Sequence, residues 1–104
     1  MNLIYNIIGD FMKHCIIVKW NEDVDKKNIL IPIKELYSGA LDIPGISGVT
    51  FIENCIDIKN RYDIMIQIEI EKDKLEFWNQ SEIHKTWKEK YGDKIMSKAI
   101  FDYE

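Results

Sequence analysis

The sequence is poor in cysteine and has no long apolar run. Its only cysteines, Cys15 and Cys55, are too few for the disulfide framework of a small secreted domain. We therefore expect free thiols and a reducing, cytoplasmic location. No stretch approaches the roughly 18–20 apolar residues of a membrane span, and the start of the chain lacks the basic residues and cleavage site of a signal peptide. We expect no membrane partner.

A concentration of positive charge is also missing. The chain carries 14 basic and 18 acidic side chains, for a net charge of -4. Lysines are most frequent in residues 85–94, where acidic residues interleave with them as on the solvated face of a helix. A nucleic-acid-binding protein would show a basic patch, so we expect no nucleic acid as a partner.

Several catalytic signatures are absent from the sequence. It has no glycine-rich phosphate loop, no G-x-S-x-G nucleophile elbow and no H-E-x-x-H zinc motif. Two histidines and two scattered cysteines do not have the spacing of a zinc site. We therefore expect neither a metal ion nor another cofactor.

The sequence does contain patterns of alternating strands and amphipathic helices. A chain of 104 residues is expected to form one domain. Period-two and helical periodicities predict strands and helices in the order strand 12–20, helix from about 28–31 to 41, strand 48–56, strand 62–71, helix 72–78, helix to 91 and strand 95–103. This βαββααβ order predicts an α+β, ferredoxin-like fold with an antiparallel sheet and helices on one face.

The other face of that sheet is expected to meet a second copy of the chain. Cys15 and Ile17 make this face partly apolar on the first strand. A chain this small cannot cover both faces of its sheet alone. The prediction is a homodimer.

The only two histidines are the candidate chemical groups. His14 shares a strand face with Ile16 and Val18, and His84 shares a helix face with Trp87. If the helix covers the sheet, both imidazoles point into one space, where they would suit acid–base chemistry. The alternative is that each is a hydrogen-bonded residue of the core or its rim. Partial burial without an acidic partner predicts a lowered pKa for His84.

Five short segments in a fixed order carry a resemblance to a known family. They are Lys13–Trp20, Ile43–Ile46, Tyr62–Ile68, Ile83–Trp87 and Ala99–Tyr103. Together they resemble the stress-responsive A/B barrel (Dabb) domain of the dimeric α+β barrel superfamily. The match makes residues 12–104 the Dabb domain and residues 1–11 an N-terminal extension. It implies a two-fold dimeric α+β barrel.

The resemblance also implies a site. In the plant polyketide-cyclase branch of the family, both histidines line a pocket, which makes His84 and His14 the catalytic candidates. There the second histidine is the base, helped by a tyrosine six residues earlier. That position is Trp78 here, and an indole cannot exchange a proton in catalysis. The family's His-Pro pair is Ser81-Glu82 here. These differences put the cyclase reaction in doubt.

The walls of the family's pocket correspond to apolar residues in this chain. They are Ile16, Val18, Ile33, Leu36, Ile64, Ile66, Ile68, Trp87 and Ile100, together with Trp78. An apolar cavity with a few polar groups would suit a small apolar ligand. The alternative is that these side chains simply fill the core. Asp102 matches the family's ending and is interpreted as a polar contact with the partner.

Three functions therefore remain open. The first is a homodimer that binds a small apolar molecule between sheet and helices. The second is a cofactor-independent acid–base enzyme, cyclase-like or monooxygenase-like, that uses His84 and His14. The third is a structural, stress-protective oligomer. Trp78 favours the first function over the second.

Overall fold

The computed structural model describes residues 10–104, and its elements follow the predicted order. They are β1 (Phe11–Trp20), α2 (Leu30–Ser38), β2 (Ile46–Glu53), β3 (Ile64–Glu71), α3 (Leu75–Asn79), α4 (Glu82–Tyr91) and β4 (Ile95–Tyr103). The strands pair antiparallel in one sheet with the order β2-β3-β1-β4. The predicted α+β, ferredoxin-like fold is confirmed.

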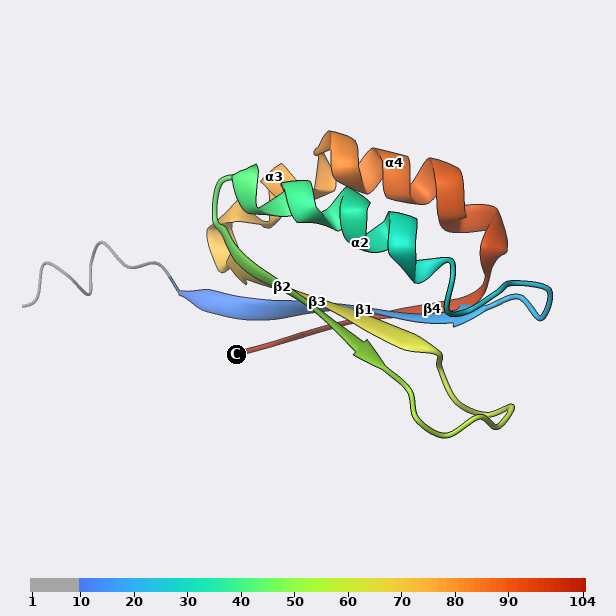
Figure 1. Ribbon diagram of the computed structural model, residues 1–104. Helices are drawn as coiled ribbons and strands as arrows, with labels where there is room; N and C mark the ends of the chain where they lie inside the picture. Colours follow the sequence, from blue (N-terminus) through green and yellow to red (C-terminus); the bar gives the residue numbers. More distant parts are fainter. Residues whose placement is uncertain (1–9) are drawn as a thin grey trace, which may run out of the picture.

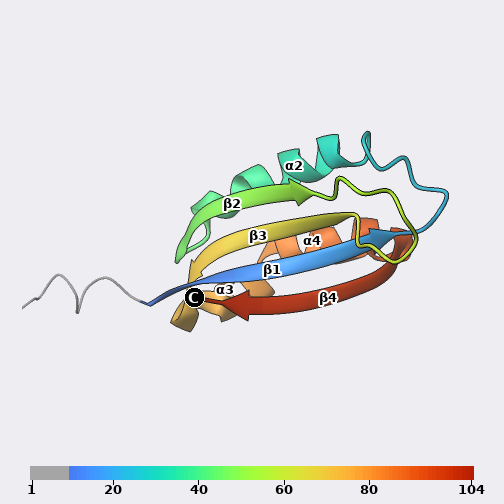
Figure 2. The ribbon, with the colours of Figure 1, turned by 90° about the horizontal axis from the view of Figure 1, so that it is seen from below.

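The molecule has two layers, a sheet and a set of helices on one of its faces. Figure 1 shows α2, α3 and α4 on the same side of the sheet. Figure 2 shows the sheet from below, with no element of residues 10–104 covering that face. A sheet with one covered face needs strands in which apolar and polar residues alternate, and the strands of this sheet show that alternation.

The alternation decides which residues face the helices. In β3 the isoleucines are 0–3% exposed, whereas the residues between them are only partly buried. Successive side chains of a strand point to opposite faces. The register pairs Ile16 with Ile66 and His14 with Ile68. His14 therefore lies on the helix-facing side of β1.

Aromatic side chains fill much of the space between the layers. The ring of Tyr37 on α2 has centroid distances of 5.6 Å to both Trp78 and Trp87. Trp87 in turn lies 6.2 Å from Trp20 in an edge-to-face arrangement. All four residues are 0–2% exposed. Such rings contribute large buried areas and specific geometry to a core.

The β2–β3 hairpin differs from the sequence prediction at both strand ends. β2 ends at Glu53 instead of residue 56, and β3 begins at Ile64 instead of residue 62. At this end of the hairpin, Asp63 accepts a hydrogen bond from the Trp20 backbone N–H at 2.8 Å and forms an ion pair with Lys26 at 3.0 Å. These contacts tie the loop to the end of β1.

The segment from α2 to β2 depends on a proline and a glycine. Pro32 lies in the first turn of α2, where a missing backbone N–H leaves no helical hydrogen bond unmade. After a 3₁₀ turn (Gly39–Asp42), Gly45 adopts a φ of 90°. A Cβ there would lie 2.4 Å from the Cβ of Lys74. This turn therefore requires glycine.

The remaining expectations concern the start of the chain and the thiols. The predicted N-terminal extension, residues 1–11, lies almost wholly outside the described residues, and β1 begins at Phe11. Cys15 is buried in β1 and Cys55 is exposed after β2, and both are free. No helix within residues 10–104 is long and apolar enough to cross a membrane.

Candidate functional site

His14 is hydrogen-bonded to an acidic residue of the last strand. The register of β1 and β4 sets His14 opposite Asp102, and His14 Nδ1–H donates to Asp102 Oδ1 at 2.6 Å. A carboxylate can only accept, so the pair fixes a proton on Nδ1 and leaves Nε2 for another partner. His14 is 7% exposed and the Asp102 side chain 42%, so the pair lies at the border of the core.

The second histidine is positioned by the start of α4. Ser81 caps this helix, and its Oγ accepts a hydrogen bond from the His84 backbone N–H at 3.1 Å. The imidazole turns back along the chain, where Nδ1–H donates to the Asn79 carbonyl at 2.9 Å. A carbonyl can only accept, so Nε2 carries the lone pair of the neutral ring. His84 thus offers one free acceptor nitrogen.

The surroundings of His84 favour the neutral ring. Burial is the largest cause and lowers the pKa of His84, while the hydrogen bond to Asn79 opposes it. The positive charges of Lys88, Lys98 and His14 lower this pKa further. The predicted direction is confirmed. Among residues 10–104, no hydrogen bond or ring contact joins His84 to His14, so the shared space expected for the two imidazoles stays a prediction.

This environment predicts the titration of His84. We expect its pKa to lie below the ordinary value of 6.5, so that the neutral ring dominates at pH 7. As the pH falls through 6.5, the unfolded chain takes up this proton before the folded one, and the contribution of neutral His84 to stability declines. NMR titration of the imidazole protons measures this pKa, with the urea-unfolded chain as reference. A higher pKa in the folded chain would contradict partial burial of His84.

Two buried polar atoms, one beside His84 and one on the neighbouring ring, have no hydrogen-bond partner among residues 10–104. They are Tyr37 Oη and Trp78 Nε1. Trp78 is 0% exposed, and its ring centroid lies 5.2 Å from that of His84 and 5.6 Å from that of Tyr37. Burial raises the pKa of Tyr37 well above its ordinary value. Each unpaired buried group costs about 1–3 kcal/mol, and an acceptor atom would satisfy either donor.

Most of the predicted pocket walls lie in the packed core. Those that are 0–3% exposed are Ile16, Val18, Ile33, Ile64, Ile66, Ile68, Trp78 and Trp87. Leu36 is partly buried and lines a groove of about 310 Å³ between α2 and α4, with Thr86 and Tyr91. Ile100 lies next to Ile16 in the register but is 50% exposed, because β4 is an edge strand.

Asp102 contacts His14 and Tyr37 contacts Trp78, although sequence patterns predict neither contact. The partner contact expected for Asp102 stays a prediction, since its side chain is still 42% exposed beside His14. The pairing of first and last strands in a ferredoxin-like sheet would point to Asp102 if the register were known. Tyr37 follows Leu36, and periodicity does not show which of the two is deeper. Within the described chain, no group of three or more His, Cys, Asp or Glu side chains is placed to hold a metal ion.

Comparisons with known proteins support the fold. No family model and no curated protein matches the chain. The chain is similar to a dimeric ferredoxin-like protein of unknown function from Thermobifida fusca (13% identity, TM-score 0.76, 91% of each chain covered). It is also similar to a Dabb family protein with a ferredoxin-like fold from Mesorhizobium loti (13% identity, TM-score 0.70, 90% of this chain and 95% of that chain). A third similar structure is the hydroxynitrile lyase from Passiflora edulis (8% identity, TM-score 0.72, 92% of this chain and 94% of that chain). The resemblance to the Dabb family is thus confirmed at the level of the fold.

Proposed function

We propose that this protein is a homodimer of the stress-responsive A/B barrel (Dabb) type that binds a small, mostly apolar molecule between its sheet and its helices. The observation that carries the proposal is a pair of unpaired buried donors, Trp78 Nε1 beside His84 and Tyr37 Oη on the ring that packs against Trp78. Buried polar groups in proteins are nearly always paired. Unpaired donors therefore fit a site whose ligand brings its own acceptor.

The contacts on offer restrict the ligand. Tyr37 and Trp78 would donate to an acceptor oxygen, and the free Nε2 of His84 would accept from a hydroxyl. The surrounding walls, such as Ile16 and Trp87, are apolar. A small phenol or enol meets these requirements. Aromatic rings fill the core, so a ligand needs a path into it. We expect the ligand to enter from the groove beside Leu36, with a shift of α2 against α4.

The homodimer is proposed from the uncovered face of the sheet. Ile17 and Met65 lie on this face in the centre of the sheet, and Phe101 is 61% exposed on its margin. Contiguous exposed apolar surface of this kind marks an interaction site. The similar proteins described as dimeric have the same fold. In this proposal residues 12–104 form the Dabb domain, and the two free thiols suit a reducing cytoplasm.

Native mass spectrometry of the protein purified from its own host tests ligand binding. We expect a dimer that carries a small molecule, released on denaturation. His84→Ala should lose this molecule and keep the dimer, whereas Lys85→Ala, at the next and exposed position of α4, should retain both. Equal retention in both variants would contradict the site. A dimer without any bound molecule would favour the structural, stress-protective oligomer.

A second candidate function is cofactor-free acid–base catalysis. The observation that favours it is the bond of 2.6 Å between His14 and Asp102, which holds the imidazole in one tautomer as an orienting carboxylate does in catalytic sites. The hydroxynitrile lyase with this fold gives a precedent for chemistry on such a scaffold. Trp78 cannot replace a proton-exchanging tyrosine. A retained molecule that wild-type protein converts and Asp102→Asn does not would favour this second candidate.

A further inference from the structure

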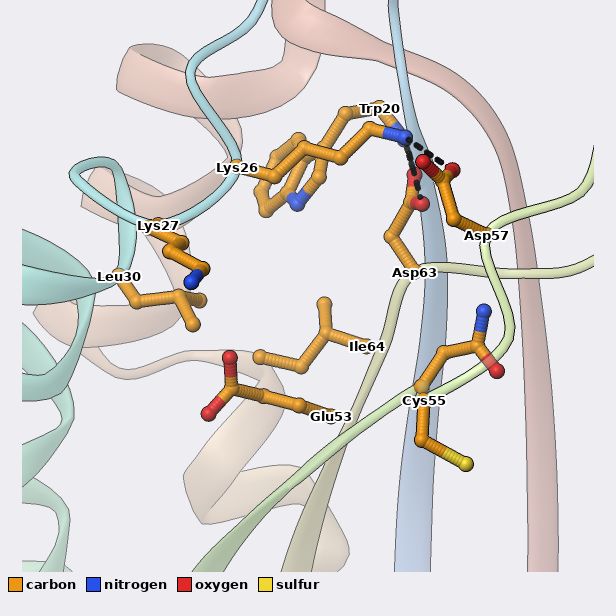
Figure 3. A pocket seen from close by; sticks show the side chains of 10 residues that line it. Trp20, Lys26, Lys27, Leu30, Glu53, Cys55, Asp57, Asp63 and Ile64 are labelled. Carbon is orange, nitrogen blue, oxygen red and sulfur yellow. Dashed lines mark hydrogen bonds and ion pairs between the residues drawn. The ribbon is translucent and has the colours of Figure 1, made fainter.

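A cavity lies at the opposite end of β1 from His14. It has a volume of about 230 Å³ and lies between the loop after β1 and the loop after β2 (Figure 3). Trp20 lines this cavity and is six positions from His14 on β1. At about 3.3 Å per residue, this separates the two places by roughly 20 Å. None of the residues His14, Tyr37, Trp78 and His84 lines the cavity, so it is distinct from the ligand site proposed near the histidines.

The floor of the cavity is apolar, and two charged residues of one wall form an ion pair with each other. Trp20, Leu30 and Ile64 are 2–6% exposed and form the floor. Lys26 is committed to Asp63, with Nζ and Oδ1 3.0 Å apart. Asp63 also accepts the Trp20 backbone N–H. These contacts hold the two loops together, and a second carboxylate of the lining, Asp57, lies 4.0 Å from Lys26 Nζ.

Two opposite charges border the cavity without an ion pair among residues 10–104. Lys27 comes from the loop before α2 and Glu53 from the end of β2. Figure 3 shows both head groups at the same opening, next to Leu30 and Ile64. Both side chains belong to exposed residues, and an ion pair between them would contribute little by itself. A molecule with both charges could contact both at once.

We propose that this cavity binds a small zwitterion of the α-amino-acid class with an apolar side chain. The carboxylate faces Lys27, the ammonium faces Glu53, and the side chain packs on Leu30 and Ile64. The volume holds about eight waters at ~30 Å³ each, which suits a ligand of about eight heavy atoms. It is below the ~300 Å³ at which pockets for drug-sized ligands begin. Because both charges are exposed, we expect a dissociation constant on the order of 1 mM.

NMR titration of the ¹⁵N-labelled full chain with L-valine tests the ligand class. We expect saturable shifts at the backbone amides of Trp20, Leu30 and Ile64. L-valinamide lacks the carboxylate, isovalerate lacks the ammonium and glycine lacks the side chain. Each should bind about threefold to tenfold more weakly than L-valine. No saturable shift with L-valine, or equal binding of any of these three analogues, would overturn the proposal.

Charge variants test the site. Lys27→Gln and Glu53→Gln should each weaken L-valine binding by a similar factor, whereas Lys85→Gln and Glu89→Gln on α4 should not. The exchange Lys27→Glu with Glu53→Lys keeps one charge of each sign at the opening, so binding should return with the ligand reversed. The spectra themselves report whether each variant is folded.

The outcome of the double exchange is decisive. Failure of a folded Lys27→Glu, Glu53→Lys protein to regain binding would overturn the bridging role of the two charges. An equal loss in the α4 variants would show that shifts arise from overall charge and would also overturn it. His84→Ala should leave L-valine binding unchanged, so this proposal and the ligand site near the histidines can fail separately.

Discussion

Replacing Trp78 by alanine is expected to lower the free energy of unfolding by about 3–5 kcal/mol. The Trp78 side chain is 0% exposed and packs on Tyr37 and His84, with ring centroids 5.6 Å and 5.2 Å away. Truncation leaves a cavity in a packed layer, and this loss is a large part of the ~5–15 kcal/mol typical of a domain. Urea unfolding followed by circular dichroism should show a lower midpoint with an unchanged slope.

The neighbouring residue provides a matched control for this loss. Phe77 lies on the same short helix but is 50% exposed, and its ring lies 5.7 Å from Lys74 Nζ. Phe77→Ala removes only this contact and exposed surface, so we expect a change of at most about 1 kcal/mol. Similar losses in the two variants would contradict the role of Trp78 as the buried anchor of α3.

The fold could be predicted because its main signals are local. The alternation of residues 64–71 specifies a strand with one buried face, and the Pro44–Gly45 turn separates α2 from β2. The hairpin ends could not be predicted in the same way. Asp63 at this end contacts Trp20 and Lys26, which are distant in sequence. Contacts between residues so far apart in the sequence form only once the strands have assembled into the sheet.

The same distinction between local signals and long-range contacts holds for the candidate site. The lowered pKa of His84 follows from its place on a helix that covers the sheet, which periodicity indicates. The bond between His14 and Asp102 joins residues 88 positions apart and depends on the register of β1 and β4. The cavity between Lys27 and Glu53 likewise joins two separate loops. Apolar residues alone do not tell a filled core from an open pocket, because both need the same side chains.

Replacing Met65 by lysine is expected to dissociate the proposed homodimer. Met65 lies on the uncovered face of β3, and the register places Ile17 and Ile52 on either side of it. In a two-fold dimer, one substitution enters the interface twice. An unpaired buried charge costs about 3–5 kcal/mol, so the dissociation constant should rise at least about 100-fold. Sedimentation at several protein concentrations measures this change.

Polar groups on the same face do not prevent its burial. Gln67 Oε1 accepts a hydrogen bond from the Tyr103 hydroxyl at 2.8 Å and contacts the Cys15 thiol at 3.7 Å. Lys13 and Glu69 form an ion pair at 3.4 Å. These contacts pair the Gln67 carbonyl, the Tyr103 hydroxyl and the Lys13–Glu69 charges within one protomer, which lowers the cost of covering them with a second copy. A lysine at position 65 has no acidic neighbour among its register partners Ile17 and Ile52.

Ile31→Lys is the control for the Met65 variant, because Ile31 is apolar and 67% exposed but lies on α2 in the helix layer. It should leave the dimer intact, and both variants should keep the circular dichroism of the wild type, since neither side chain is fully buried in the protomer. Dissociation by Ile31→Lys alone would mean that two copies meet through their helices. A wild-type monomer at micromolar concentration would contradict the homodimer itself, because the apolar sheet face would then remain in water.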